Sequence, residues 1–390
     1  MLADAPAVSR RLLAGGASDF MAVWELSVAG SHAAIGRALA DEARSRFGFA
    51  PAPADPRLNR ARRRWFERNW PQHHARMTGV AAGFGLDPER DDVNLADLDL
   101  VTGRFGCSAV WCPPTRSADG CGRLGRNFDF FTGSWRELLG AFGAPALSAA
   151  VADPPIGSRP YVIRELPEHG PACTSISLFG FDGCMEGINA DGLAVALLLA
   201  DVRSAAPPPE PRPRAGLNEH QVPRFLLDTC SDVQQAEEAL LCAKQYDSGA
   251  ACHYAVADAS GRGFVWERGE QTSEHIIEAG AGTLCVTNHL LHLHPDLDRL
   301  PDDDERSHQT YQRIRRLSQR TDRERLTRAA LCDALDAVAA AEDPAWRTLW
   351  RSVFELERRS MATRFYLGDR PDGSFRYSEE QVLAPGSAPR

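Results

Sequence analysis

The chain has 390 residues, of which 43% are hydrophobic, and its formal net charge is -9. This length and apolar content suffice for one large domain or two ordinary ones. The negative charge, without a stripe of Lys and Arg interleaved with aromatic residues, excludes the usual pattern of a nucleic-acid-binding protein.

The sequence also excludes a membrane protein of the helical kind, because it contains no run of 18 apolar residues. Its first 20 residues lack a basic stretch followed by a continuous apolar segment, which argues against a signal peptide and for a cytoplasmic protein. The 10 cysteines include no C-x-x-C pair, so we expect reduced thiols and no structural zinc knuckle.

The N-terminal part of the chain predicts one strand followed by helices. Residues 21–29 read as a strand, and Ser31 is placed to cap a helix over 32–47. A second helix is expected over 57–84, with a break near Pro71. Four arginines lie in its first half, and we interpret them as a solvated helix face: Arg60, Arg62, Arg63 and Arg64.

From residue 107 onward, short apolar runs alternate with turns, which predicts a system of buried antiparallel strands. The expected strands are 107–112, 122–130, 160–165, 173–180, 184–189, 193–199, 253–257, 263–268, 283–287, 349–355 and 361–367. The expected helices are 223–230, 233–243, 306–318 and 325–341. Asp191-Gly192 predicts a hairpin, the proline-rich segment 205–214 a stiff loop, and the tail after Glu380 a loose end. The predicted class is α+β, with helices covering antiparallel sheets.

The dipeptide Gly106-Cys107 is the first candidate for chemistry. If its peptide bond were cut, Cys107 would carry both a thiol and a free α-amine. The reference pKa of an α-amine is about 7.7–8.0 and that of a thiol about 8.5, so the amine can act as general base for its own side chain. Attack of the thiol on the preceding carbonyl would give a thioester that water hydrolyses. The alternative is an inert, buried cysteine at the start of a strand.

A second stretch, Gly125-Arg126-Asn127-Phe128-Asp129, follows at the distance of a hairpin, with Asp119-Gly120 as a turn signal. Pairing of the two stretches would bring Arg126 and Asp129 near the start of the first strand. An arginine beside a thiol favours the thiolate, and an aspartate can hold a new ammonium group. The alternative is a surface ion pair at the end of a hairpin.

Four features in order resemble the acyl-CoA:6-aminopenicillanic-acid acyltransferase family, which comprises N-terminal-nucleophile hydrolases related to the choloylglycine hydrolases. The features are the segment 1–106 before Cys107, Gly-Arg-Asn-x-Asp at 125–129, Gly-x-Asn-x-x-Gly-Leu at 187–193, and Thr-Asn-His at 287–289. A weaker likeness covers Tyr254 to Asp258 and Val265 to Glu267.

The resemblance implies a four-layer αββα sandwich. Residues 1–106 would be a propeptide-like segment that becomes an α chain, and residues 107–390 the nucleophile-hydrolase core, with both fragments staying associated. Cys107 would be nucleophile and, through its amine, base. Asp129 would support that amine, Arg126 would lie beside the thiol, and Asn288 would offer an amide N–H to the oxyanion.

The family resemblance implies a small-molecule substrate: an amide, or an acyl-CoA thioester with an amine acceptor. The expected activity is that of an autoprocessed cysteine acyltransferase or amide hydrolase, and these residues do not decide between the two. No organic cofactor and no metal ion are expected.

One departure from the family pattern leaves a second hypothesis open. The family often carries Ser-x-x-Arg-x-x-Arg, whereas this chain has Ser307 and Arg313 with Thr310 in place of the first arginine. The chain could therefore be an unprocessed, non-catalytic member that binds a small molecule or a partner protein.

Two competing signals are weaker. Gly120 to Gly125 fits G-x-G-x-x-G, but a strand is expected after it where a dinucleotide site needs a helix. His289, His292 and His294 are the basis of a third hypothesis, zinc hydrolysis, although Pro295 interrupts any strand there.

Overall fold

The computed structural model of the chain describes residues 5–98, 106–134, 136–137, 154–178, 180–200, 215–245, 251–269, 273–305, 307–343 and 345–386. The loop expected at 205–214 lies outside these residues. Among the described residues, no helix has the length and apolar character needed to span a membrane.

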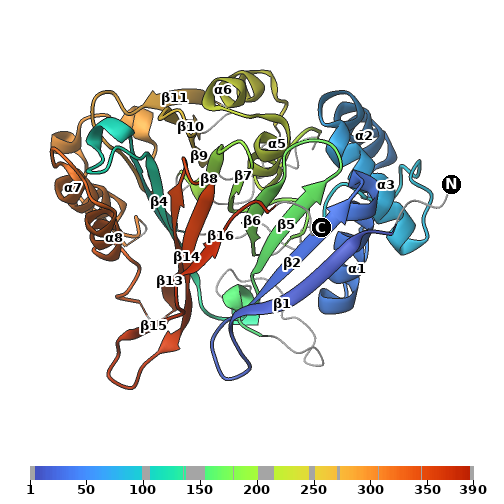
Figure 1. Cartoon of the computed structure of the whole chain (residues 1–390), viewed down its shortest axis with the longest axis horizontal. Helices are drawn as coiled ribbons and strands as arrows, with labels where there is room; N and C mark the ends of the chain where they lie inside the picture. Colours follow the sequence, from blue (N-terminus) through green and yellow to red (C-terminus); the bar gives the residue numbers. More distant parts are fainter. Residues whose placement is uncertain are drawn as a thin grey trace.

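The helices and sheets form four layers, as Figure 1 shows. Helices α7 and α8 pack on one sheet, while α1, α5 and α6 pack on the other, and the two sheets face each other between these helical layers. The prediction of an α+β fold with an αββα layer order is therefore confirmed. The helices are α1 (His32–Phe47), α2 (Pro56–Asn69), α3 (Pro71–Phe84), α5 (Gln221–Thr229), α6 (Val233–Cys242), α7 (Thr310–Thr321) and α8 (Arg328–Asp336).

The larger sheet has nine strands in the order β1-β2-β5-β6-β7-β8-β9-β10-β11. Its strands are β1 (Ala7–Gly15), β2 (Ala22–Gly30), β5 (Tyr161–Pro167), β6 (Cys173–Ser177), β7 (Glu186–Asn189), β8 (Ala194–Leu199), β9 (Cys252–Ala257), β10 (Gly263–Arg268) and β11 (Glu274–Glu278). Every pair in it is antiparallel except β2 with β5. That parallel pair joins the N-terminal segment to the rest of the sheet.

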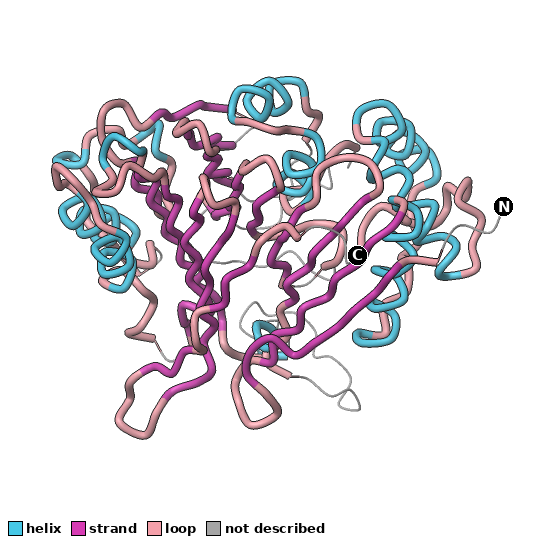
Figure 2. The backbone as a smooth tube through the Cα atoms, viewed as in Figure 1, coloured by secondary structure: helices cyan, strands magenta, loops and turns pink. Residues whose placement is uncertain are grey.

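The smaller sheet has seven strands in the order β12-β3-β4-β13-β14-β15, with β16 also paired to β14. Its strands are β3 (Gly106–Cys112), β4 (Arg123–Phe131), β12 (Leu284–Val286), β13 (Trp346–Glu355), β14 (Ser360–Asp369), β15 (Phe375–Tyr377) and β16 (Gln381–Leu383). Figure 2 draws the strands of both sheets in magenta and the helices outside them in cyan. The predicted hairpin between 107–112 and 122–130 is confirmed as β3 and β4, and it sets Gly106 opposite Asp129.

Strand alternation decides which way Cys107 points, because successive side chains of a strand face opposite sides of its sheet. Cys107, Ala109 and Trp111 belong to the apolar core between the two sheets. Val110 and Cys112 instead pack with residues of α7 and α8. The Cys107 side chain therefore faces the larger sheet.

Local sequence signals account for most of these elements. The side chain of Ser31 caps α1 by accepting a hydrogen bond from the Ala34 N–H, 3.2 Å away. The break at Pro71 is confirmed, because α2 ends before it and α3 begins with it. The Asp191-Gly192 hairpin is also confirmed: Gly192 has φ +94°, and Asn189 Oδ1 accepts from the backbone N–H of Leu193 at 3.0 Å.

Two expectations about chain segments are wrong. The tail after Glu380 is not loose, because β16 pairs with β14 and buries Leu383. Strand β1 was not expected, and the reason is physical: its residues 7–12 are exposed, so they carry no apolar alternation. Pairing with β2 makes this segment a strand, although its own sequence does not indicate one.

The solvated-face interpretation of the arginine run holds for Arg60 and Arg64, which are exposed, but it is wrong for Arg62. The Arg62 guanidinium is buried, forms an ion pair with Asp97 and donates to Gln221 Oε1 at 2.7 Å. Gln221 opens α5, so this buried contact ties the N-terminal segment to the larger sheet's helical layer. This arginine is buried because it pairs with a carboxylate that is distant in the sequence. Helical periodicity alone does not indicate such a pairing.

Helices α1 and α3 approach each other closely at three glycines: Gly36 of α1 and Gly79 and Gly83 of α3. A Cβ built on Gly79 would lie 1.8 Å from the Ala33 carbonyl oxygen, whereas one built on Gly83 would lie 3.2 Å from the Ala40 Cβ. We predict that Gly79→Ala lowers the free energy of unfolding by about 2 kcal/mol or more, since backbone must move to admit the methyl group. Gly83→Ala, the matched control, should change it by less than about 1 kcal/mol, because alanine's helix propensity offsets the contact. Urea denaturation compares them, and equal stabilities would contradict the close-packing argument.

Candidate active site

The Cys107 thiol is buried and in contact with the guanidinium of Arg126. Arg126 Nη2 lies 3.3 Å from Cys107 Sγ. Burial raises the pKa of the Cys107 thiol to about 11, even though the guanidinium of Arg126 acts in the opposite direction. At neutral pH the thiol in this environment is therefore protonated, and a base must remove its proton before the sulfur can attack a carbonyl.

Arg126 is positioned by the opposite sheet. Its guanidinium forms a fully buried ion pair with Glu186 of β7 and donates to the Leu197 carbonyl oxygen of β8 at 2.7 Å. Its Cζ also lies 4.7 Å from the centre of the Phe128 ring. Although burial alone would lower it, the interactions with Cys107 and Glu186 raise the pKa of Arg126, so the guanidinium stays charged.

Two hydroxyl groups in turn support the Glu186 carboxylate, Ser352 directly and Thr363 through Ser352. Ser352 of β13 donates to its carboxylate, and Ser352 Oγ lies 2.9 Å from Thr363 Oγ1 of β14. The Arg126 charge beside the thiol is thus held in place by a series of buried contacts that links the two sheets. The motif at 125–129 predicts Arg126 beside the thiol, but only the fold supplies its counter-charge.

The backbone N–H of Cys107 donates to Asn288 Oδ1 at 2.9 Å. Arg313 Nη2 donates to the same oxygen at 2.5 Å, and Asn288 Nδ2 donates to the Leu199 carbonyl oxygen at 2.6 Å. Two donors on one atom fix the orientation of this amide, because turning it over would set its NH₂ group against them. The Nδ2 atom carries two hydrogens and Leu199 takes one, so one amide hydrogen remains.

Asp129 lies on the other face of the sheet, toward α7. Arg313 Nη1 donates to Asp129 Oδ2 at 2.9 Å, and Thr348 Oγ1 donates to Asp129 Oδ1 at 2.5 Å. Arg313 Nη1 also lies 3.4 Å from the Cys107 carbonyl oxygen. One guanidinium thus links Asp129, Asn288 and the backbone of the candidate nucleophile.

The structure brings together all four candidate catalytic residues expected from the sequence: Cys107, Arg126, Asp129 and Asn288. Arg313 was expected only as a possible structural residue, although its place in the Ser-x-x-Arg-x-x-Arg pattern was a usable signal. Glu186 was missed, and a glutamate inside the apolar run 184–189 was the signal that could have found it. Thr348 and Ser352 carry no such signal in the sequence.

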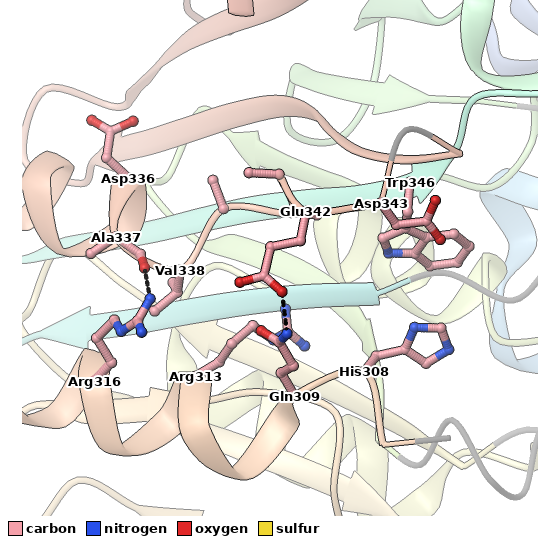
Figure 3. A pocket seen from close by; sticks show the side chains of 13 residues that line it. His308, Gln309, Arg313, Arg316, Asp336, Ala337, Val338, Glu342, Asp343 and Trp346 are labelled. Atoms are coloured by element: carbon pink, nitrogen blue, oxygen red, sulfur yellow. Dashed lines mark hydrogen bonds between the residues drawn. The ribbon is translucent and has the colours of Figure 1, made fainter. Parts of the chain in front are cut away.

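A cavity of about 310 Å³ opens between the start of α7 and the segment before β13 (Figure 3). Arg313 and Trp346 line it, and Trp346 Nε1 would lie 3.2 Å from a Cβ built on Gly106. Gln309 Nε2 donates to Glu342 Oε2 across it at 2.5 Å (Figure 3). Through Trp346, which packs against Gly106, and Arg313, which contacts the Cys107 carbonyl, the cavity borders residues that touch the Gly106–Cys107 pair from the helical side of the sheet.

Of the three clustered histidines, His292 contacts the carboxylate of Glu267, whereas His289 contacts Thr287 and Thr310. Glu267 receives hydrogen bonds from His253 Nε2 at 2.7 Å, from His292 Nδ1 and from the Leu291 N–H. Within the described ranges, no three His, Cys, Asp or Glu side chains converge in a way that could hold a metal ion. The hydrogen bonds and the charge of His253 outweigh burial, so the pKa of Glu267 falls to about 2.

Glu186→Gln tests the ion pair beneath the thiol. We predict that it lowers the free energy of unfolding by about 3 kcal/mol, because it leaves the Arg126 charge buried without its counter-ion. Glu238→Gln, at an exposed position of α6, should change it by less than about 0.5 kcal/mol. Urea denaturation of both variants beside the parent protein measures this. Indistinguishable stabilities would mean that the pair is energetically neutral.

Glu267→Gln tests the lowered pKa of that carboxyl group. A folded-state pKa of about 2, below the ordinary value of 4.5, adds stability above pH 4.5 that is lost as the pH falls toward 2. The shift corresponds to about 3 kcal/mol. Unfolding free energies should therefore converge as the pH falls from about 4.5 toward 2, because the parent loses this advantage over the variant in that range. A gap that stays constant with pH would contradict the assignment.

Comparisons with known proteins give one family match and several solved structures of low sequence identity. A search of curated proteins finds no match to the sequence. Solved structures with a similar arrangement include a conjugated bile acid hydrolase variant from Clostridium perfringens (TM-score 0.45, 13% identity, 73% of this chain and 99% of that chain covered). Penicillin V acylase from Agrobacterium tumefaciens gives a TM-score of 0.41 at 15% identity, covering 66% of this chain and 82% of that one.

An N-acylethanolamine-hydrolyzing acid amidase ortholog from Caenorhabditis elegans gives a TM-score of 0.39 at 14% identity, with 64% of this chain and 93% of that chain covered. The sequence model described as acyl-coenzyme A:6-aminopenicillanic acid acyl-transferase matches residues 152–370, more than half of the chain. The matched range holds Glu186, Asn288 and Arg313, and the polar contacts above join these to Cys107. The chain belongs to the acyl-coenzyme A:6-aminopenicillanic acid acyl-transferase family.

Proposed function

We propose that the protein is an acyltransferase or amide hydrolase that cuts its own chain between Gly106 and Cys107 and then uses Cys107 as nucleophile. The observation that carries this proposal is the set of polar partners around one residue. The thiol of Cys107 has Arg126, its N–H has Asn288, and its carbonyl has Arg313. A cysteine kept only for packing has no need of three such partners.

The processing step needs only the Cys107 thiol, the Gly106 carbonyl and water. The Cys107 sulfur attacks the Gly106 carbonyl carbon, the C–N bond breaks, and the nitrogen leaves as an amine with the thiol's proton. Water then hydrolyses the resulting thioester to a Gly106 carboxylate and a free thiol. The contact between Arg313 and the Cys107 carbonyl supports this proposal, because it fixes the backbone next to the bond that would be cut.

In the processed protein the α-amine of Cys107 would take the thiol proton, which the raised pKa of the buried thiol makes necessary. The sulfur then attacks the substrate carbonyl, and the leaving group departs with the proton held on the amine. An acyl-thioester remains on Cys107. An amine acceptor or water attacks it, and the acyl group leaves as an amide or an acid.

The neighbouring residues would divide the remaining work. Arg126 stabilises the thiolate by its charge, and Asn288 Oδ1 accepts from the α-amine, as it accepts from the backbone N–H. The second amide hydrogen of Asn288 is available to the oxyanion. Asp129, paired with Arg313, offsets the positive charge that develops on the amine.

The two fragments, 1–106 and 107–390, would remain associated after processing. Strands β1 and β2 of the first fragment pair within the nine-stranded sheet, and Arg76 of α3 forms a buried ion pair with Asp228 of α5. Trp70 Nε1 donates to the same carboxylate at 2.9 Å. Separation would expose an apolar sheet face and unpaired buried charges.

The first experiment is the intact mass of the purified protein under denaturing conditions, beside Cys107→Ala and the control Cys112→Ala on the same strand. We predict two fragments divided between Gly106 and Cys107 for the parent and the control, and one full-length chain for Cys107→Ala. Incubation with an acyl-CoA should then add one acyl mass to the fragment that begins at Cys107.

A single full-length chain in all three samples, with no acyl adduct, would overturn the proposal. It would favour a non-catalytic family member that binds a small molecule or a partner protein. Processing without an acyl adduct calls for repeating the incubation with a chromogenic amide, and failure there as well would leave self-cleavage as the protein's only chemistry.

A further inference from the structure

The cavity between α7 and the segment before β13 has no part in the proposed function (Figure 3). Its volume of about 310 Å³ lies at the lower end of the range of about 300–1,000 Å³ that ligand pockets span, so it suits a small molecule. It lies on the helical side of the smaller sheet, whereas the Cys107 side chain belongs to the core between the two sheets. An occupant of this cavity would therefore be separate from the acyl group on the thiol.

Arg313 brings hydrogen-bond donors without partners to this cavity. It lines the cavity and is 8% exposed. Its contacts with Asp129 Oδ2, the Cys107 carbonyl and Asn288 Oδ1 use at most three of its five N–H groups. Its Nε atom is buried and has no hydrogen-bond partner among the described residues. Because a buried donor without a partner costs free energy, this side chain favours a ligand that carries an acceptor.

A second arginine lines the cavity one turn further along α7. Arg316 is exposed, and its Nη1 atom donates to the Ala337 carbonyl oxygen at 3.0 Å. Within the described ranges, no carboxylate forms an ion pair with Arg316. Residues three apart share one face of a helix, so Arg313 and Arg316 present two guanidinium groups to the same space. Guanidinium groups match the geometry of a carboxylate, which is thus the acceptor that this wall favours.

Two carboxylates line the same cavity from the segment before β13. Glu342 accepts from Gln309 Nε2 at 2.5 Å, and Asp343 accepts from a backbone N–H at 2.9 Å. Both donors are neutral, so both negative charges lack a counter-ion in the part of the chain that the structure describes. Asp336, a third carboxylate of the lining, is instead paired with Arg351. The charges of Glu342 and Asp343 favour a ligand that carries an ammonium group.

An aromatic ring completes the lining. Trp346 is half-buried, and its ring centre lies 5.2 Å from that of His308 with 23° between the two planes. The segment 337–341, Ala-Val-Ala-Ala-Ala, lines the cavity with small apolar side chains. These groups favour an apolar ligand side chain, and an aromatic one in particular, because rings pack favourably on an indole.

The edge of the cavity beside α7 has a defined backbone conformation. His308 and Gln309 are consecutive residues with left-handed backbone, at φ +49° and +57°. Their side chains hold this conformation from outside the helix, one stacked on Trp346 and the other bonded to Glu342 (Figure 3). The aromatic wall and one carboxylate are therefore in place before a ligand arrives, which lowers the entropy cost of binding.

We infer that this cavity binds a free α-amino acid with an apolar side chain. The arginines of α7 bind its carboxylate, Glu342 and Asp343 bind its ammonium group, and its side chain packs on Trp346. A simple acid would leave the two carboxylates without a partner, and a simple amine would leave the arginine donors without one. The inference goes beyond the proposed function and does not require that Cys107 reacts.

The test compares three probes that share a phenyl ring. L-Phenylalanine carries both charges, hydrocinnamate lacks the ammonium group, and phenethylamine lacks the carboxylate. The protein is the full-length Cys107→Ala variant labelled with ¹⁵N-tryptophan. The indole N–H resonance of Trp346 is assigned by its absence when Trp346→Phe is added to the same variant. Titration with each probe then gives its Kd from the shift of that resonance.

We expect L-phenylalanine to shift the Trp346 resonance saturably and to bind at least about tenfold more tightly than either of the other probes, the size of one charge-assisted hydrogen bond. Glu342→Gln should weaken L-phenylalanine about tenfold and leave hydrocinnamate within about twofold, because only the ammonium contact is changed. Glu342 is exposed, so the variant should fold. The control Glu238→Gln on α6 should leave the Kd of every probe unchanged.

A resonance that does not move up to the solubility limit of L-phenylalanine would overturn the inference and leave a cavity filled with solvent. Equal affinities for the three probes would also overturn it, because they would show apolar contact without recognition of charge. The Cys107→Ala variant can be neither processed nor acylated through its thiol. An unprocessed parent protein would therefore count against the proposed function alone, and the Kd values would still decide on the amino-acid site.

Discussion

The buried Arg126 guanidinium is the interaction on which the rest of the site depends. It touches the Cys107 thiol from the smaller sheet, and Glu186 and the Leu197 carbonyl hold it from the larger one. A charge inside an apolar sandwich is stable only when its partners are fixed, so the two sheets must keep one spacing and register at this point. Burial raises the pKa of the thiol to about 11, and Arg126 is the first group that opposes this effect. The buried ion pair thus leaves a guanidinium in contact with a thiol that burial keeps protonated.

Arg313 organises the other face of the same strand. Through Asp129, Asn288 and the Cys107 carbonyl, it connects three elements that are far apart in the sequence. Helix α7 can present it because Asp303 caps that helix, accepting from the backbone N–H of Gln312 at 2.7 Å. The helix was expected from residue 306, and it begins later, at Thr310, because Gln309, at its N-cap, is left-handed with φ +57°. Turn geometry of that kind leaves no mark in helical periodicity.

The sequence predicts well whatever depends on neighbours along the chain. Strands β3 and β4, the helix break at Pro71 and the Asp191-Gly192 hairpin follow from apolar runs and turn residues, and the family motifs bring Cys107, Arg126, Asp129 and Asn288 to one place. Partners brought in from other elements were not predictable. Glu186 beneath Arg126, Thr348 on Asp129 and Asp97 on Arg62 meet their partners only after the two sheets and their helices have packed. The exposed strand β1 was not predicted for the opposite reason: its pairing with β2 requires no apolar pattern of its own.

Thr310 stands where the family pattern has an arginine, and this difference has a physical consequence that a count of matching motif residues does not show. An arginine there would bring a second charge to a corner that already holds Arg313, whereas threonine brings one short hydroxyl. That hydroxyl closes a ring of hydrogen bonds with Thr287 and the Nδ1 atom of His289. The ring leaves Nε2 without a hydrogen and without a partner, beside the residue that holds the Cys107 N–H. Thr310 thus gives this corner a hydrogen-bonded hydroxyl where an arginine would give it a second cation beside Arg313.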